Sequence, residues 1–231
     1  NGTATDGLGG IDELYRSIDG AIGTEFDDIL IGDNSRTEFD GNGGDDYLDG
    51  RGGNDVLFGG AGNDEIHGGY GDDHIEGGVG IDRIYAGADD DTVVWTLGEG
   101  NDIVDFDGGW DRVVVYTGST DEIVTVTSNA TDVVEIAGVD WLLTMVKGDI
   151  TELRTGAGDD EVVIGDLAGT DLNKVYVYFG EGNDLLSGAG ATTSIYAFGE
   201  SGNDRFAGGA GSDSFYGGAG VDWVDNSEEP S

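Results

Sequence analysis

Aspartate residues recur at one position of a nine-residue unit through most of the chain. In a clear copy such as GGAGNDEIH (59–67), glycines precede the aspartate and an apolar residue follows it two places later. Glycine lets a turn adopt backbone angles that other residues avoid, and the turn offers carbonyl oxygens beside the carboxylate. Oxygens of these two kinds are the ligands that Ca²⁺ prefers, about six to eight at a time. The unit therefore predicts a calcium-binding turn.

The candidate metal ligands are the aspartates at position six of the unit and the turn glycines before them. The aspartates are Asp12, Asp28, Asp46, Asp55, Asp64, Asp73, Asp82, Asp91, Asp102, Asp111, Asp160, Asp184, Asp204, Asp213 and Asp222. The glycines are Gly41, Gly43, Gly50, Gly52, Gly59, Gly60, Gly62, Gly68, Gly69, Gly71, Gly77, Gly78, Gly80, Gly208, Gly209, Gly211, Gly217, Gly218 and Gly220. Thr37 and Thr193 occupy position six without a carboxylate, so we expect weak or empty sites there.

Position eight of the unit is apolar in essentially every copy and predicts a core. Positions seven to nine form a very short strand, whose middle side chain points inward while its neighbours point outward. Two units then make one coil, with a strand in each of two sheets. The expected inward stacks are Leu30, Leu48, Ile66 and Ile84 in one sheet, and Phe39, Leu57, Ile75 and Val93 in the other; Phe215 and Val224 belong to the last copies.

Stacking also explains how a turn that supplies too few ligands could complete a calcium site. Turns on the same edge are two units apart, so their carboxylates come together in pairs. The expected pairs are Asp28/Asp46, Asp46/Asp64, Asp64/Asp82, Asp55/Asp73, Asp73/Asp91 and Asp204/Asp222, with Asp82/Asp102 and Asp184/Asp204 spanning two-residue insertions.

The units, among them GRGGNDVLF (50–58), GGYGDDHIE (68–76) and GGAGVDWVD (217–225), resemble the RTX (repeats-in-toxin) calcium-binding repeats of secreted bacterial proteins. The resemblance implies an all-β, right-handed parallel β-roll, a solenoid with two repeats per coil. It also implies that each site takes turn carbonyls and the repeat aspartate from two successive turns on one edge. The chain contains no EF-hand loop.

The composition limits the function classes. The 49 acidic and 9 basic residues give a formal net charge of −40, so we expect no nucleic-acid partner. No apolar run is long enough for membrane insertion. The absence of cysteine excludes disulfides and thiolate sites, which suits a chain stabilised by Ca²⁺. No motif supplies a nucleophile, a base and an oxyanion hole together, so we expect no enzyme.

The repeat pattern divides the chain into four parts. Residues 1–114 form a first calcium-binding array and 154–225 a second. Between them, 115–153 lose the glycines and alternate apolar and polar residues, which predicts strands at 123–127, 133–136 and 141–145. We expect ion-free coils or a hairpin there, with a separate small domain as the alternative. Residues 226–231 form an acidic tail.

Two further groups of side chains have residue types that could form a site. His67 and His74 fall at positions nine and seven of successive units, which places them on opposite sheets and makes a shared metal improbable. Outward aromatic residues either form a sugar-binding or packing stripe or, as we favour, serve as strand formers. They are Tyr15, Tyr47, Phe58, Tyr85, Tyr196, Tyr216 and Trp223.

We expect a calcium-binding structural segment that folds on binding several Ca²⁺ ions. The parent would be a secreted or surface-anchored bacterial protein of the adhesin, filament or surface-layer type. The alternative is the calcium-dependent module of a type I-secreted enzyme with its catalytic domain outside this chain. The chain begins with Asn1 and shows no solenoid caps, so we expect a processed chain or fragment. Self-association, continuation into a longer chain, and contacts with a cell surface or polysaccharide are the expected partners.

Overall fold

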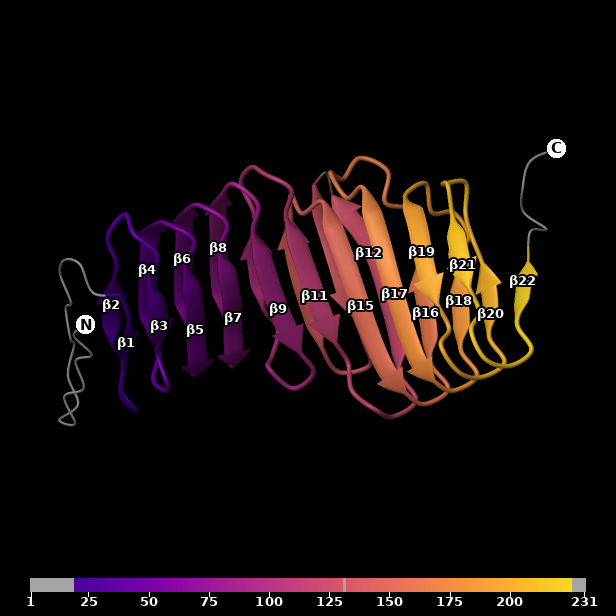
Figure 1. Ribbon diagram of the computed structural model, residues 1–231, viewed down its shortest axis with the longest axis horizontal. Helices are drawn as coiled ribbons and strands as arrows, with labels where there is room; N and C mark the ends of the chain where they lie inside the picture. The colour runs from indigo at the N-terminus through magenta and orange to yellow at the C-terminus, as the bar shows by residue number, and fades with distance from the viewer. Residues whose placement is uncertain (1–18, 131, 226–231) are drawn as a thin grey trace. The chain divides into compact units, whose positions relative to one another are not determined.

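A computed structural model describes residues 19–130 and 132–225, and these residues form strands and turns without any helix (Figure 1). No helix among them could therefore span a membrane. The chain divides into two compact units, Asn1–Arg112 and Val113–Ser231. The expected ligand Asp12, the aromatic Tyr15 and the tail 226–231 lie outside the described residues.

The first unit is a parallel solenoid in which successive strands alternate between two sheets. One sheet has the order β1 (Ala21–Ile22), β3 (Glu38–Asp40), β5 (Val56–Ala61), β7 (His74–Val79), β9 (Thr92–Thr96). The other has the order β2 (Ile29–Ile31), β4 (Tyr47–Gly52), β6 (Glu65–Tyr70), β8 (Arg83–Ala88), β10 (Ile103–Asp105). Each strand therefore pairs with the strand one full coil away.

The pairing register confirms the expected inward stacks. In one sheet Leu48 lies opposite both Leu30 and Ile66, and in the other Leu57 lies opposite both Phe39 and Ile75. All six side chains are at most 1% exposed. The repeat period thus fixes which side chains fill the core, because parallel pairing aligns identical positions of successive coils.

The second unit continues this plan with longer and less regular coils. One of its sheets has the order β11 (Arg112–Tyr116), β15 (Ile150–Ala157), β17 (Lys174–Glu181), β19 (Ser194–Phe198), β21 (Ser214–Tyr216). The other has the order β14 (Leu142–Val146), β13 (Val133–Ala137), β12 (Ile123–Ala130), β16 (Glu161–Ile164), β18 (Leu185–Ser187), β20 (Arg205–Ala207), β22 (Trp223–Asp225).

The glycine-poor segment forms an antiparallel meander at the three predicted strands. Strand β12 pairs antiparallel with β13, which pairs antiparallel with β14. Strand β12 also runs parallel to β16, with Val124 opposite Val162. The segment is thus part of the sheet of this unit, because one strand carries both pairing modes.

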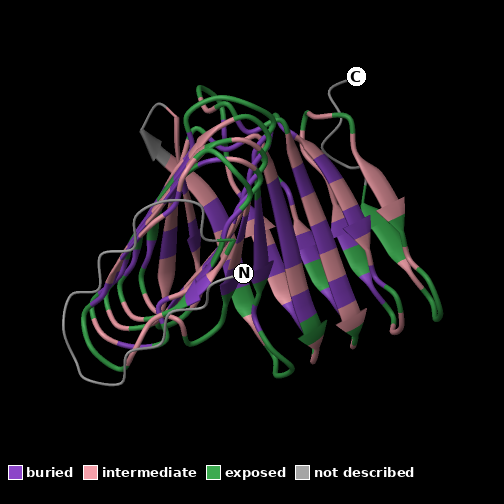
Figure 2. Ribbon diagram, turned by 60° about the vertical axis from the view of Figure 1, so that its left-hand side comes forward, coloured by how far each residue is buried: buried purple, intermediate pink, exposed green. Residues whose placement is uncertain are grey.

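Buried and partly exposed residues alternate along the strands of both sheets (Figure 2). The two-residue insertions lengthen β9 and β19, so each adds a second inward side chain, Trp95 and Ala197. The prediction of a buried position eight is wrong for Phe215, which is half-buried, and for Val224, which is 50% exposed. Among the described strands β22 pairs with β20 alone, so Val224 is covered on one side only.

Candidate metal centre

The position-six aspartates connect each coil to the one before it. The Oδ1 atom of Asp64 accepts a hydrogen bond of 2.8 Å from the backbone N–H of Asp46, and Oδ1 of Asp82 accepts one of 2.8 Å from Asp64. Oδ1 of Asp73 likewise accepts from Asp55. The same bond recurs at Asp46, Asp55, Asp91, Asp102, Asp111, Asp160, Asp184, Asp204 and Asp222, with the backbone donor at position six of the preceding coil. Oδ1 of Asp213 accepts instead from the N–H of Ile195, at position eight.

The second carboxylate oxygen of most of these residues is buried and has no hydrogen-bond partner. This holds for Oδ2 of nine aspartates and for Oδ1 of Asp28. A buried anionic oxygen without a partner costs several kcal/mol, so it needs a proton or a cation. The nine are Asp46, Asp55, Asp64, Asp73, Asp82, Asp91, Asp160, Asp184 and Asp204.

At six of these nine aspartates a glycine at position one makes room beside this oxygen, whereas position one is Ala86, Thr155 and Phe179 in the units of Asp91, Asp160 and Asp184. A Cβ atom on Gly59 would overlap Oδ2 of Asp64 and the carbonyl oxygen of Gly77, which belongs to the next coil. A Cβ on Gly41 would likewise overlap Oδ2 of Asp46 and the carbonyl oxygen of Gly59. A carboxylate and a carbonyl oxygen thus border one small space, which we call the position-one cradle. Hard oxygens around a space that only glycine leaves open fit Ca²⁺.

The glycines at positions two and four serve backbone conformation instead. Gly60 has φ 109° and Gly62 has φ 147°, a region that favours glycine. In the two preceding units, Gly44 and Gly53 stand at position four and also have a positive φ. Neither was among the expected ligand glycines. The expected ligands Gly43 and Gly52 stand at position three, without a positive φ.

Burial is the main influence on the acidity of the buried position-six carboxyl groups. It raises the pKa of Asp46 and Asp73 to about 7, that of Asp64 to about 6, and that of Asp82 and Asp91 to about 8. Neighbouring aspartates in adjacent coils raise several of these further, whereas the backbone hydrogen bond opposes the shift. The solenoid thus holds a ladder of carboxyl groups that favour a neutralising partner.

Not every position-six residue offers the same site. Thr37 fills its place with a hydroxyl that donates 3.0 Å to the carbonyl oxygen of Ser35. Thr193 donates to the carbonyl oxygen of Leu172 instead. Asp213 is half-buried, and its Oδ2 accepts from the N–H of Gly209 at 3.1 Å. Asp89 adopts φ 82° at position four, where glycine usually stands, and Asp91 keeps the regular buried arrangement.

Position five carries a second ladder that the sequence analysis missed. The Oδ1 atom of Asp45 accepts from the N–H of Asn63 at 2.8 Å, and Oδ1 of Asn63 accepts from Ile81 at 3.0 Å. These bonds run toward the following coil, opposite to those of position six. The frequent Asn and Asp at this position were the available signal. Two opposed ladders fix the spacing between coils and therefore the cradle geometry.

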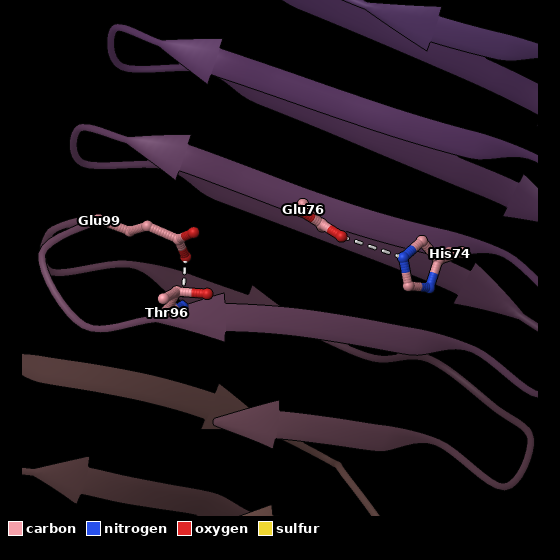
Figure 3. A network of polar contacts seen from close by, with 4 residues as sticks. All are labelled: His74, Glu76, Thr96 and Glu99. Carbon is pink, nitrogen blue, oxygen red and sulfur yellow. Dashed lines mark hydrogen bonds and ion pairs between the residues drawn. The ribbon is translucent and has the colours of Figure 1, made fainter. Parts of the chain in front are cut away.

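The histidines lie on opposite sheets, as predicted. His67 is on β6 and bonds Glu65, whereas His74 is on β7 and bonds Glu76 at 3.2 Å (Figure 3). Figure 3 also shows the turn after the two-residue insertion of Trp95 and Thr96, where Oε2 of Glu99 accepts a hydrogen bond of 2.6 Å from the N–H of Thr96. Within the described residues no three His, Cys, Asp or Glu side chains cluster as a metal site. The position-one cradles differ from such a cluster, because each combines one carboxylate with a backbone carbonyl oxygen.

The outward aromatic residues form ladders between strands. His67 stacks on Tyr85, and Phe198 stacks between Tyr178 and Tyr216 with ring centres 4.7 and 4.9 Å apart. The near-parallel rings face one another across neighbouring strands, and this stacking stabilises the sheet. Tyr178 and Phe198 were not among the predicted outward aromatics.

The fold and the cradles define a class of protein. It is a parallel β-solenoid whose glycine-rich turns stack buried carboxylates against backbone carbonyls of the next coil.

A comparison with known protein families identifies the repeats of this solenoid. The RTX calcium-binding nonapeptide repeat matches residues 22–57, 32–66, 40–74, 67–94 and 198–228. The chain carries RTX calcium-binding repeats in these segments, as the sequence resemblance predicted. No curated protein matches the chain.

Proposed function

We propose that this chain is a calcium-dependent structural β-roll of a secreted or surface-exposed bacterial protein, and that its role is mechanical rather than catalytic. The observation that carries the proposal is the repeated cradle, in which a buried, unpartnered Oδ2 faces a carbonyl oxygen of the next coil. The carboxylates come from the six aspartates that have glycine at position one, namely Asp46, Asp55, Asp64, Asp73, Asp82 and Asp204. The position-one residues of successive coils supply the carbonyls.

The charge of the chain explains why folding would depend on the ions. A formal charge of −40 opposes compaction, and the cradle carboxylates are buried in the folded state. Each Ca²⁺ removes two charges, so about ten ions would reduce the net charge to about −20. The binding free energy then becomes free energy of folding.

The proposal is tested by following secondary structure against free Ca²⁺. Circular dichroism should show a largely disordered chain in chelator and a β-rich chain in millimolar Ca²⁺. Equal β content in both conditions would contradict the proposal.

Two adjacent aspartates supply a matched pair of variants. Asp73→Asn removes a charge from a cradle, whereas Asp72→Asn removes one from position five, where Asn63 shows that asparagine suits the ladder. Calorimetric titration should show weaker calcium binding for Asp73→Asn and nearly unchanged binding for Asp72→Asn. Equal effects would assign the binding to bulk charge rather than to the cradles.

A further inference from the structure

A turn of the glycine-poor segment reproduces the repeat geometry without its sequence signature. The N–H of Glu122 donates 2.8 Å to Oδ1 of Asp160, which is the position-six bond. The N–H of Asp159 donates 3.0 Å to Oδ1 of Asp121, which is the position-five bond. Gly118 has φ 125°, as position two requires. Glu122 therefore occupies position six of a coil that lacks the repeat aspartate.

Glu122 and Asp160 lie in neighbouring coils, joined by the hydrogen bond from the backbone N–H of Glu122 to the carboxylate of Asp160. Thr120 holds Oε1 of Glu122 through its N–H at 3.2 Å and its hydroxyl at 2.6 Å. Oε2 of Glu122 and Oδ2 of Asp160 are buried without a partner, and Asp160 is 2% exposed. Two buried carboxylate oxygens without a hydrogen-bond partner, in neighbouring coils, need a neutralising partner such as a cation.

Asp160 has no position-one cradle, because threonine stands there in place of glycine. The Glu122 turn therefore differs from the glycine-lined repeat sites. Position one of the Asp160 unit is Thr155, whose hydroxyl donates 3.1 Å to the carbonyl oxygen of Phe179. The carbonyl oxygen of Phe179 corresponds to the position-one carbonyl oxygen of the next coil, which faces the carboxylate in a regular turn. Position one of the Glu122 coil is Thr117, whose Oγ1 is a further buried oxygen without a partner. The buried oxygens without a hydrogen-bond partner in these two coils are thus Oε2 of Glu122, Oδ2 of Asp160 and Oγ1 of Thr117.

We propose that Glu122 and Asp160 together bind one divalent cation of the calcium type between two coils of the second unit. The site lies beside the segment 115–153 that we expected to be ion-free, and it uses a glutamate where the repeat uses aspartate. The inference rests on the proposed calcium-dependent function. The longer side chain suits a coil in which threonine fills the position-one space, because its carboxylate reaches farther from the backbone.

The test counts the ions bound by the full chain. Decalcified protein is dialysed against saturating CaCl₂, and bound calcium per chain is measured by elemental analysis alongside calorimetric titration. Glu122→Gln should bind one ion fewer than the wild type. The control Glu161→Gln, which changes the residue next to Asp160 at an outward position, should bind the wild-type number.

The outcomes separate this inference from the proposed function. If the wild type binds calcium and Glu122→Gln binds the same number with the same affinities, the Glu122 site is refuted and the repeat sites stand. If the wild type binds no calcium, the proposed function fails and this site with it. If Glu122→Gln does not fold, Thr120→Val decides, because it keeps both carboxylates and removes the hydroxyl that holds Oε1. One ion should then bind more weakly, and unchanged binding would overturn the inference.

Discussion

The indole of Trp95 donates a hydrogen bond of 2.7 Å to Oδ2 of Asp102. That oxygen is the one left without a partner at nine other position-six aspartates. Trp95 is 2% exposed and belongs to the two-residue insertion that lengthens β9. At this coil a side-chain donor therefore serves the carboxylate that elsewhere faces a cradle.

This relationship predicts that Trp95 stabilises its coil through Asp102. Trp95→Phe leaves a buried oxygen unsatisfied, so it should lower the free energy of unfolding by about 1–3 kcal/mol beyond the cost of the smaller ring. Urea unfolding in saturating Ca²⁺ measures the loss. A double-mutant cycle with Asp102→Asn isolates the hydrogen bond, and a coupling energy near zero would contradict the interaction. Trp110→Phe, at a 60% exposed position, is the control and should have little effect.

The position-one cradle can be filled without removing any ligand. Gly59→Ala places a Cβ against Oδ2 of Asp64 and the carbonyl oxygen of Gly77, so it should abolish or weaken binding of one ion. Gly43→Ala is the matched control, because its nearest neighbour would be 3.5 Å from the new Cβ and the backbone angle is ordinary. Calorimetric titration of the two variants should differ clearly. Similar titrations would show that the space beside Gly59 does not hold the ion.

The position-five ladder should contribute to stability rather than to calcium affinity. Asn63→Val removes the acceptor for the N–H of Ile81 and the amide donor to Asp45, so we expect a loss of about 1–3 kcal/mol in the free energy of unfolding. Asn63→Asp keeps the acceptor and should cost less. Urea unfolding in saturating Ca²⁺ tests the order of the two variants. Equal losses would place the effect in packing or charge.

The sequence predicted the fold and the carboxylate ladder because both follow from spacing alone. Parallel pairing turns a nine-residue period into the stacks of Leu48 and Leu57, and the same period brings Asp46 next to Asp64. Residues that break the period were invisible to this reasoning. Trp95 acts from an insertion, and Glu122 differs in both residue type and glycine context. Their roles depend on which atoms meet across coils, and the repeat pattern holds no information about that.

Acid should partly replace the cations. Burial raises the pKa of Asp46 to about 7 and those of Asp82 and Asp91 to about 8, above the ordinary value of 3.8 expected for the unfolded chain. The folded, calcium-free chain then holds protons more tightly than the unfolded chain. Protonation of these carboxyl groups therefore makes its full contribution to folding stability below about pH 4. This contribution is lost as the pH rises through 6 to 8. In metal-stripped buffer, circular dichroism should show more β structure at pH 5.5 than at pH 8.

A triple variant separates protonation of these buried carboxyl groups from a general loss of negative charge. Asp46→Asn, Asp82→Asn and Asp91→Asn together mimic the protonated carboxyl groups, and each keeps an oxygen for the backbone bond from the preceding coil. Without calcium this variant should hold more β structure than the wild type at pH 8 and change less on acidification. The control Asp45→Asn, Asp72→Asn and Asp90→Asn removes the same charge from exposed position-five sites. If both triple variants lose their pH dependence equally, overall charge repulsion rather than buried carboxyl groups governs folding of the calcium-free chain.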